Sequence, residues 1–399
     1  MWRLKGKVEM KKKILFVINS LGFGGAEKSL TSLLTMFDYN KYDIDLLMFR
    51  PEGDFLSFLP KEVKILPQLH FLQNSSWAKQ ITHPAYLITH VKATLALRIN
   101  KKYGNLHDAQ CYWKYAGSMF NCLTKSYDVA IAWGQGNPTH YVTEKVKALK
   151  KIAFINADYI KAGHNKNFDE AFYRKYNYII GVSDQLAQMI RDVFPDMKNK
   201  IKTIYDINNA ELIQKLSKES NPFRRENDNL ILVTVGRLVE AKGYDLAIEA
   251  ARVLNKNNIK FKWFFVGDGP ERQTLEHKVE EYGLKEKVIL VGAKRNPYVY
   301  MKNADIYVQT SRFEGYCLTL GEARILNTPV ISTNFDVVYN QLRDEENGLI
   351  VEMDPVVIAD AIIRLWNDMG LREHIVSNLK KEKKGNPEEI EKLYQLIEE

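Results

Sequence analysis

The sequence predicts an α/β protein of two domains, each built on an open, mainly parallel sheet, and three observations support this. Its 399 residues exceed the roughly 100–200 residues of a typical single domain. Short apolar runs bounded by turn residues, typical of buried parallel strands, alternate along the chain with segments of helical spacing. A polar, charged stretch at 221–229 (NPFRRENDN) separates two such series, and we place the linker between the domains there.

In the first half, an apolar strand at 14–18 is followed by a glycine loop and a helical pattern over 26–37. Met10 and the three lysines after it resemble a second chain start. We therefore expect residues 1–9 to be an upstream extension and the first domain to cover 12–220. Further strands are predicted at 44–49, 129–133, 152–155 and 179–182.

The second half, predicted to form a domain over 229–375, alternates strand and helix more regularly. Its strands are expected at 230–235, 263–266, 288–291, 306–309 and 330–332, and helices at 245–254, 271–282 and 321–326. The tail, 376–399, contains NPEEIEKLYQLIEE. With Asn386 as N-cap, Pro387 at the first position and acids in the first turn, it predicts a closing amphipathic helix.

Composition excludes several classes of protein. Apolar residues make up 45% and charged residues 27%, as in ordinary globular proteins, so extensive disorder is not expected. No stretch approaches the ~20 consecutive apolar residues of a membrane span, and no signal peptide is predicted. Three cysteines without a Cys-x-x-Cys spacing argue against a disulfide framework and favour a reducing cytoplasm. The net charge of +8 favours an anionic partner, whether nucleic acid, lipid or a phosphorylated small molecule.

The first motif is the glycine loop GFGGAE at 22–27, between the first strand and its helix. Glycines such as Gly24 and Gly25 let the backbone approach a ligand and leave helix N-terminal amides facing an anion. The dinucleotide fingerprint would need a glycine where Glu27 stands, which argues against a hydride-transfer enzyme. A plain tight turn without a ligand remains the alternative.

The second motif, GRLVEAKG at 236–243, directly follows the first strand of the second half. Arg237 and Lys242 are two cations at the carboxyl end of a strand, where they can bind a diphosphate and stabilise its charge as it leaves. Both can equally be ordinary solvated side chains.

The third motif, SRFEGYCLTLGEA at 311–323, is the most specific. Glu314 and Glu322 are eight positions apart, a little over two turns at about 3.6 residues per turn, so both can address one ligand. A helix is predicted to begin near 316–318, with free amides facing phosphate oxygens. A carboxylate only accepts hydrogen bonds, which suits neighbouring sugar hydroxyls. The alternative is a helix N-terminal charge and a surface glutamate.

Taken together, these blocks resemble the family-4 retaining glycosyltransferases of the GT-B fold. The second half matches with GRLVEAKGYDLAIEA, FFVGDGPERQTLE, VILVGA and SRFEGYCLTLGEARILNTPVIST, and the first half with LGFGGAEKSL, IIGVSD and IYDINN. The likeness covers roughly 12–363. It implies two Rossmann-like domains that face each other across a nucleotide-sugar cleft, and closure of the domains to assemble the site.

The resemblance also implies residue roles. Arg237 and Lys242 would hold the donor diphosphate, Glu314 the transferred sugar and Glu322 the ribose. Gly24 and Gly25 would lie against the phosphates or sugar, and Lys294 near the nucleobase. The backbone at the predicted helix start completes the expected donor site, with Gly315, Tyr316, Cys317 and Leu318. The helix start can also lower the pKa of Cys317, although we expect a backbone role there.

One departure concerns the acceptor side. Relatives that build cell-surface polymers often carry Trp-x-His-x-Asp where this chain has FINAD at 154–158. Asp158 is kept and is counted among the expected catalytic residues with Glu314, Arg237 and Lys242, whereas Asn156 replaces the histidine. Asn156 cannot take a proton, so a mechanism with a protein base here is in doubt. Retaining enzymes of this fold are thought to let the leaving phosphate oxygen deprotonate the acceptor.

A basic and aromatic stretch lies between residues 77 and 126. Such a composition suits the headgroup region of an anionic membrane, no nucleic-acid-binding motif accompanies it, and a solvated helical face is the alternative. The basic residues are Lys79, Lys92, Arg98, Lys101, Lys102, Lys114 and Lys125, against the single acid Asp108, and the aromatic ones are Trp77, Tyr86, Tyr103, Tyr112, Trp113 and Tyr115.

The sequence thus predicts a hexosyltransferase that moves a sugar, with retention, from a nucleotide-sugar, expected to be a UDP-sugar, to a saccharide hydroxyl. By resemblance to capsule and exopolysaccharide enzymes, the acceptor is expected to be lipid-diphosphate-linked, and the protein cytoplasmic or peripheral at the inner membrane face. No cofactor and no metal are expected, since no His-x3-His occurs and the only Asp-x-Asp, Asp43 and Asp45, lies in a predicted strand. The alternatives are a sugar-nucleotide epimerase or hydrolase of the same fold and a non-catalytic GT-B partner or chaperone subunit.

Overall fold

The computed structural model describes residues 10–22, 24–73, 84–223 and 229–399. The expected upstream extension, residues 1–9, lies outside the described residues, as do Trp77 and Lys79. The chain forms two compact units. Of the described residues, the first unit comprises 10–22, Ala26–Tyr205 and Glu388–Glu399, and the second comprises Gly24 and Gly25 of the glycine loop together with Asp206–Pro387.

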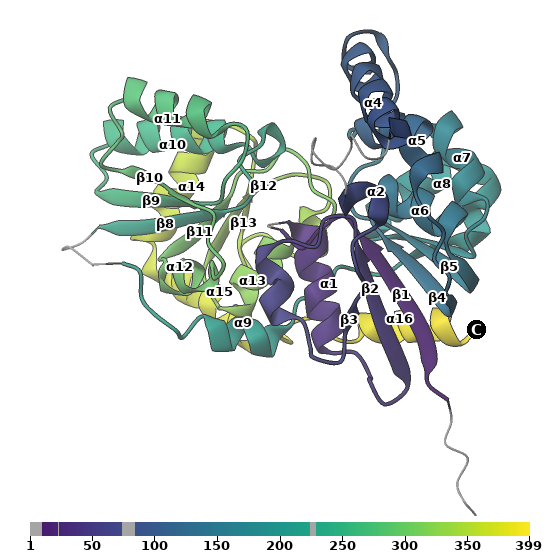
Figure 1. The fold of residues 1–399 in the computed structure, drawn as a ribbon. Coiled ribbons are helices and arrows are strands. Elements are labelled where there is room, and N and C mark those ends of the chain that lie inside the picture. Colours follow the sequence, from purple (N-terminus) through teal and green to yellow (C-terminus); the bar gives the residue numbers. More distant parts are fainter. Residues whose placement is uncertain (1–9, 23, 74–83, 224–228) are drawn as a thin grey trace, which may run out of the picture. The chain divides into compact units, whose positions relative to one another are not determined.

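The first unit is built on a seven-stranded parallel sheet in the order β3-β2-β1-β4-β5-β6-β7 (Figure 1). The apolar run predicted at 14–18 forms the core of β1, where Ile14 pairs with Ile44 on one side and Val129 on the other. The strands are β1 (Lys12–Ile18), β2 (Tyr42–Met48), β3 (Lys64–Ile65), β4 (Ser126–Trp133), β5 (Lys147–Ile155), β6 (Tyr178–Gly181) and β7 (Ile201–Thr203).

Some helices of the first unit begin where a side chain satisfies a free backbone amide. Asn165 accepts a hydrogen bond from the Phe168 amide at the start of α7, and Ser183 accepts one from the Leu186 amide at the start of α8. The helices are α1 (Gly25–Thr35), α2 (His70–Gln73), α4 (Pro84–Tyr103), α5 (Asp108–Ala116), α6 (Asn137–Lys145), α7 (Lys166–Tyr173), α8 (Asp184–Val193) and α16 (Glu389–Glu398).

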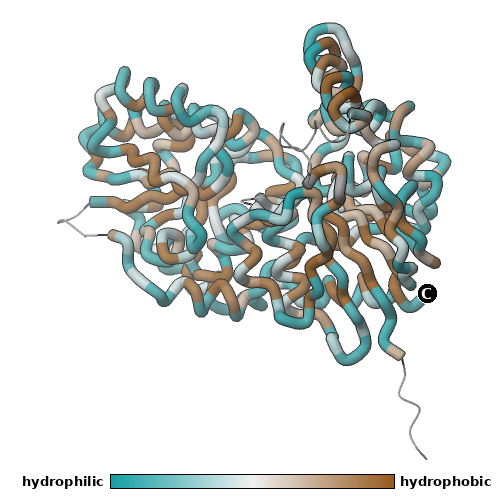
Figure 2. Tube along the Cα trace, in the orientation of Figure 1, coloured by the Kyte–Doolittle hydropathy of each residue, from teal (hydrophilic) through white to brown (hydrophobic). Residues whose placement is uncertain are grey.

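The second unit has a six-stranded parallel sheet in the order β10-β9-β8-β11-β12-β13. Its strands are β8 (Leu230–Val235), β9 (Phe261–Val266), β10 (Val288–Gly292), β11 (Ile306–Gln309), β12 (Val330–Thr333) and β13 (Leu349–Val351). Hydropathy along the trace shows apolar residues gathered in these strands (Figure 2). Trp263 and Phe265, both fully buried on β9, form part of the core.

Helices lie on both faces of this sheet, with α10 and α11 on one side and α12 and α13 on the other (Figure 1). They are α9 (Ala210–Leu216), α10 (Tyr244–Lys256), α11 (Arg272–Glu281), α12 (Tyr298–Asn303), α13 (Leu318–Ile325), α14 (Pro355–Asn367) and α15 (Met369–Lys381). The order of strands reverses at β8, which pairs with β9 on one side and β11 on the other. Ligands of open parallel sheets bind at such a switch point, outside the carboxyl ends of the strands.

The units divide at Tyr205–Asp206, before α9, and not within 221–229 where we placed the linker. α9 belongs with the second unit for a physical reason: the Asn208 amide nitrogen donates to the Leu318 carbonyl at 3.2 Å, and Asn296 donates to the Leu216 carbonyl at 2.9 Å. These contacts join residues far apart in the sequence, so a local change in composition cannot reveal them.

The C-terminal tail also differs from the expected 376–399 segment. Residue 376 lies inside α15, and the chain returns to the first unit at Glu388. α16 packs there through Tyr394, which stacks on Tyr42 with ring centroids 5.2 Å apart. The predicted amphipathic helix is therefore present, but it is an integral part of the first unit.

Asn386 is not the N-cap of that helix, which is a correction to the prediction. α16 begins at Glu389, and Asn386 instead links the segment before α16 to the segment before α9. Its side-chain oxygen accepts from the Asn208 amide at 3.0 Å, and its amide nitrogen donates to the Asp206 carbonyl at 2.8 Å. Both groups of the side chain are thus already used by backbone outside the helix.

Along the described stretches of the chain, the helices are too short or too polar for any of them to cross a lipid bilayer.

Candidate functional site

The loops that follow β8 and β11 are packed directly against each other in the second unit. Gly243 lies between them with a φ of 62°, in the left-handed region, and a Cβ added there would stand 2.0 Å from the Thr310 carbonyl oxygen. Only glycine fits this position. The Thr310 hydroxyl donates to the Lys242 carbonyl at 3.0 Å, which fixes the two loops together.

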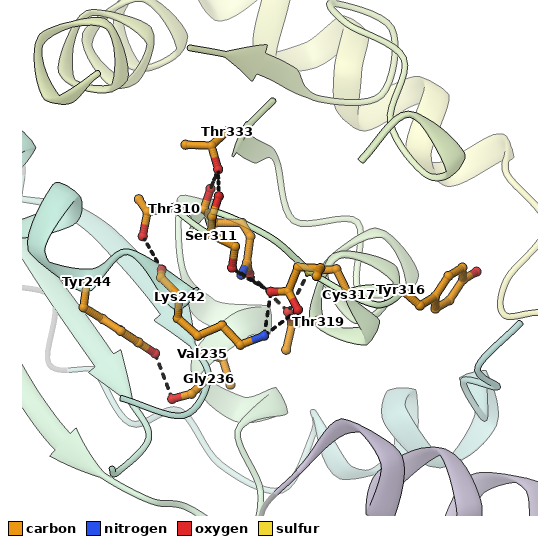
Figure 3. A network of polar contacts seen from close by, with 12 residues as sticks. Val235, Gly236, Lys242, Tyr244, Thr310, Ser311, Tyr316, Cys317, Thr319 and Thr333 are labelled. Carbon is orange, nitrogen blue, oxygen red and sulfur yellow. Dashed lines mark hydrogen bonds and ion pairs between the residues drawn. The ribbon is translucent and has the colours of Figure 1, made fainter. Parts of the chain in front are cut away.

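Lys242 and Glu314 form an ion pair across these loops. The Lys242 ammonium donates to both carboxylate oxygens of Glu314, at 2.5 and 2.6 Å. Figure 3 shows Lys242 extending from its loop toward the segment that carries Ser311 and Cys317. The lysine side chain is 24% exposed and the glutamate side chain 8%, so the pair is largely shielded from water.

Two further side chains hold the Glu314 carboxylate from the β11 side. The Ser311 hydroxyl donates to one oxygen at 2.6 Å, and the Gln309 amide nitrogen donates to the same oxygen at 3.2 Å. Gln309 is itself oriented by the Thr319 hydroxyl, which donates to its amide oxygen at 3.1 Å, and by a hydrogen bond from Tyr307. The carboxylate is therefore held in place even without the lysine.

The charge state of Lys242 follows from these contacts. Burial lowers the pKa of Lys242, but the charge of Glu314 and its hydrogen bonds outweigh burial, and the pKa is raised above its ordinary value. Lys242 is consequently a cation at neutral pH, and Glu314 supplies its counter-charge in this structure.

The predicted helix start is found at Leu318, the first residue of α13. Cys317 precedes it in the left-handed conformation, with a φ of 67°. The Gln341 amide nitrogen donates to the Tyr316 carbonyl at 2.5 Å and to the Cys317 carbonyl at 3.1 Å, which fixes the loop that also contains Gly315. The Tyr316 ring points away from the ion pair (Figure 3).

The helix start does not lower the pKa of Cys317. Burial raises the pKa of this thiol, the Glu314 charge raises it further, and Lys242 offsets only part of the rise. The cysteine is therefore a neutral, buried thiol, which corrects the expectation of a lowered pKa and argues against a nucleophilic role.

Glu322 is fully buried in α13 and does not contact the ion pair in any described interaction. It faces Tyr298 at the start of α12: burial raises the pKa of Tyr298 well above its ordinary range, and the hydrogen-bonded Glu322 carboxylate raises it further. Its expected role at a ribose stays a prediction.

The other two expected cations have exposed side chains. Arg237 follows β8 after Gly236, and Lys294 follows β10. Arg237 belongs to the loop that also carries Lys242. The structure therefore brings Lys242 and Glu314 into contact, puts Arg237 on the same loop as Lys242, and leaves the side chains of Arg237 and Lys294 exposed.

The two residues that we expected on the acceptor side, Asn156 and Asp158, lie in the first unit, after β5. Asp158 closes a turn, since its carboxylate accepts from the Ile160 and Lys161 amides at 3.0 and 2.9 Å. The Asn156 backbone amide donates to Gln135 at 3.1 Å. The side-chain oxygen and nitrogen of Asn156 are buried and find no hydrogen-bond partner among the residues that the structure describes. Unlike Asn156 and Asp158, the glycine-loop residues Gly24 and Gly25 group with the second unit.

Sequence reasoning missed the side chains that hold Glu314. Gln309, Ser311, Thr319 and Thr333 are all polar and all at least partly buried, and Thr333 donates to the Ser311 carbonyl at 2.6 Å. One signal was available: Gln309 is a polar residue at the end of an otherwise apolar strand, only five positions before Glu314. Elsewhere in the described ranges, no three His, Cys, Asp or Glu side chains come close enough to hold a metal ion.

Comparison with known proteins gives several matches. Residues 217–382 match the family described as "Glycosyl transferases group 1". An uncharacterized glycosyltransferase of Methanocaldococcus jannaschii is 31% identical over 268 residues, which cover 61% of this chain and 68% of that protein. A 4-alpha-N-acetylgalactosaminyltransferase of Campylobacter jejuni, named for an N-acetylgalactosamine-N,N'-diacetylbacillosaminyl-diphospho-undecaprenol substrate, is 27% identical over 86% of this chain and 87% of its own length.

Two other curated relatives, a further glycosyltransferase of Methanocaldococcus jannaschii and one of Staphylococcus aureus, are matched over only 48% and 43% of their own length, so the chain spans about half of each. Among solved structures, HepE of Anabaena in complex with UDP and glucose is similar in fold, with a TM-score of 0.70 at 15% identity, over 97% of this chain and 99% of that one.

Proposed function

Because the chain belongs to the group 1 glycosyl transferases and has the GT-B fold of two Rossmann-like domains, we propose that it transfers a sugar from a nucleotide-sugar to a saccharide acceptor in cell-surface polysaccharide synthesis. The donor is a UDP-sugar, the transferred group is a hexosyl unit, and the anomeric configuration is retained. The UDP complex of the similar HepE structure and the names of the curated relatives support this choice.

The observation that carries the proposal is the ion pair of Lys242 and Glu314 at the carboxyl ends of β8 and β11. A diphosphate bound beside Lys242 competes with Glu314 for the ammonium, and the exposed Arg237 adds a second, bidentate grip. Glu314, still held by Ser311 and Gln309, is then free to accept hydrogen bonds from sugar hydroxyls. Donor binding thus replaces the ion pair between Lys242 and Glu314 by two new contacts, one of Lys242 with the diphosphate and one of Glu314 with the sugar.

The same two cations serve the chemical step. When the bond between the sugar and the diphosphate breaks, negative charge accumulates on the leaving phosphate, and Lys242 and Arg237 stabilise it electrostatically without requiring a metal ion. The backbone amides of 315–318, at the start of α13, add fixed positive dipoles. The leaving phosphate oxygen takes the acceptor proton, so that neither Asn156 nor another protein base is needed.

Five further positions complete the proposed site. Glu322 binds the ribose, Lys294 lies near the nucleobase, and Gly24 and Gly25 allow close approach of the backbone to the phosphates or sugar. Asp158 contributes from the acceptor side, where it already fixes the loop after β5.

The acceptor is a lipid-diphosphate-linked saccharide at the inner face of the membrane. The Campylobacter jejuni relative, matched over most of both chains, is named for such a substrate, and the basic stretch between residues 84 and 126 supplies charge of the complementary sign.

A direct test measures UDP binding and transfer from a panel of UDP-sugars, using the full chain with and without a lipid-linked saccharide. Lys242→Met is expected to weaken UDP binding and abolish transfer, whereas Lys260→Met, at an exposed lysine before β9, serves as the matched control. Transfer by Lys242→Met at the rate of the unaltered chain would contradict the proposal. Turnover of the donor without any acceptor would favour a hydrolase or epimerase, and no binding of any donor would favour a non-catalytic partner.

A further inference from the structure

Helix α4 presents its apolar residues to solvent. Ile88, Val91, Leu95 and Ile99 recur at helical spacing and are 53%, 45%, 51% and 61% exposed. At about 100° per residue these four positions fall on one narrow face of the helix. Figure 2 shows apolar segments along this helix, which stands out from the rest of the first unit in Figure 1.

The opposite face of α4 is the one that packs on the protein, where Tyr86 and His90 contact Phe71 with ring centroids 5.2 and 4.6 Å apart. Thr89 and Ala93 are the buried residues of the helix. The exposed face of four branched aliphatic side chains is therefore unexplained by the packing of the first unit.

The charges of α4 identify what this face can bind. Lys92, Arg98, Lys101 and Lys102 lie on the helix, and its sequence contains no Asp or Glu. All four cations are exposed, and Lys92 and Arg98 flank the apolar face on its two sides. A helix with an apolar face bordered by cations is suited to the boundary between headgroups and acyl chains of an anionic bilayer.

A second copy of this chain fits less well as a partner. In a two-fold symmetric contact the same face meets itself, so eight cations and no carboxylate of the two α4 helices would be brought together. An acidic lipid surface has the complementary charge and an apolar interior that accepts aliphatic side chains.

We propose that α4 is a membrane-docking helix, which lies on the surface of an anionic bilayer with Ile88, Val91, Leu95 and Ile99 inserted below the headgroups and its four cations among the lipid phosphates. The inference deepens the proposed action on a lipid-linked acceptor and rests on it for its biological purpose, but the binding of lipid by α4 is measurable independently of sugar transfer.

The test is co-sedimentation of the full chain with vesicles of phosphatidylcholine alone, or of equal parts phosphatidylcholine and phosphatidylglycerol. The unaltered chain should bind the anionic vesicles, and bind them more weakly as salt rises. Leu95→Ser with Ile99→Ser should weaken this binding about tenfold or more, and Lys101→Gln with Lys102→Gln should weaken binding to anionic vesicles only.

Matched controls use exposed residues outside α4. Leu149→Ser, at a leucine of β5 that is 85% exposed, and Lys61→Gln with Lys64→Gln should leave vesicle binding unchanged. UDP binding should be the same in all these variants, because none touches the second unit. A chain that fails to bind UDP but still binds vesicles through α4 would contradict the proposed function and leave this inference standing.

Three results would overturn the inference. The first is equal vesicle binding by the unaltered chain and the Leu95→Ser, Ile99→Ser variant. The second is equal binding to neutral and anionic vesicles. The third is an oligomer in solution that the same variant converts to a monomer with no change in vesicle binding, which would make the face a contact between copies of the chain.

Discussion

Replacing Glu314 by glutamine tests the central ion pair most sharply. The substitution keeps the shape of the side chain and an oxygen that can still accept from Ser311, but it removes the charge that the Lys242 ammonium contacts at 2.5 and 2.6 Å. Lys242 then remains mostly shielded from water without a counter-charge, and the dominant remaining influence on its pKa is burial, which lowers it.

The magnitude follows from the exposure of the pair. Removing one partner of a fully buried ion pair costs ~3–5 kcal/mol of unfolding free energy. The Lys242 side chain is 24% exposed, so part of its charge is still solvated. We therefore expect Glu314→Gln to destabilise the chain by about 1–3 kcal/mol. If the carboxylate also contacts the sugar in the transition state, turnover should fall by about 10²-fold or more.

Urea unfolding and donor turnover are measured together on Glu314→Gln, Lys242→Met and the double variant. The double variant should be more stable than Glu314→Gln alone, because it no longer contains an unpaired ammonium, while all three should be inactive. Glu280→Gln, which breaks the exposed pair with Lys285, is the control and should change neither quantity. An unaltered unfolding midpoint for Glu314→Gln, or turnover close to that of the unaltered chain, would show that this reasoning is wrong.

Three other substitutions have defined outcomes. Arg237→Ala should cut turnover by about 10²-fold with little change in urea stability, because the side chain is exposed; equal turnover would remove it from the site. Asn156→Ala should keep or raise the unfolding free energy by up to about 1 kcal/mol, because it removes a buried amide without a described partner, and a clear loss in urea unfolding would contradict this. Burial lowers the pKa of His107, so the unfolded chain binds the proton more readily and stability should fall as the pH drops below about 6.5. His107→Asn keeps an acceptor for the Ala109 amide, and urea unfolding at several pH values should show a smaller fall of its unfolding free energy toward acid pH. The same fall in both chains would refute the assignment to His107.

The two sheets could be predicted from the sequence because their central strands are buried on both faces. The runs at 14–18 and 230–235 are nearly all apolar, and they form the strands at which each sheet reverses order. Short edge strands such as β3 and β13 carry too few residues to give a pattern. The outward apolar face of α4 was also missed, because helical spacing alone does not tell which side of a helix meets the protein.

The candidate site was predictable in its charges but not in its supports. Lys242 and Glu314 follow neighbouring strands, so the parallel topology alone brings their loops to one edge of the sheet. The partner that each side chain contacts depends on distances between residues that are far apart in the sequence, and a local motif does not reveal those distances. Asn386 illustrates the same limit, since its local context suggested a helix cap and its actual partners are about 180 residues away.

The return of the chain through α16 has a consequence for synthesis. A ribosome that has completed 1–205 has made every strand of the first sheet, yet not the helix whose Tyr394 stacks on Tyr42 and accepts a hydrogen bond of 2.8 Å from the Asp38 amide. The first unit is therefore finished only after the second has been translated, contrary to the usual order in which N-terminal domains fold first. A nascent chain in this interval lacks the contacts that Tyr394 of α16 later makes with the rings of Phe37 and Tyr42, so a peptide of 388–399 supplied early is expected to protect it from aggregation.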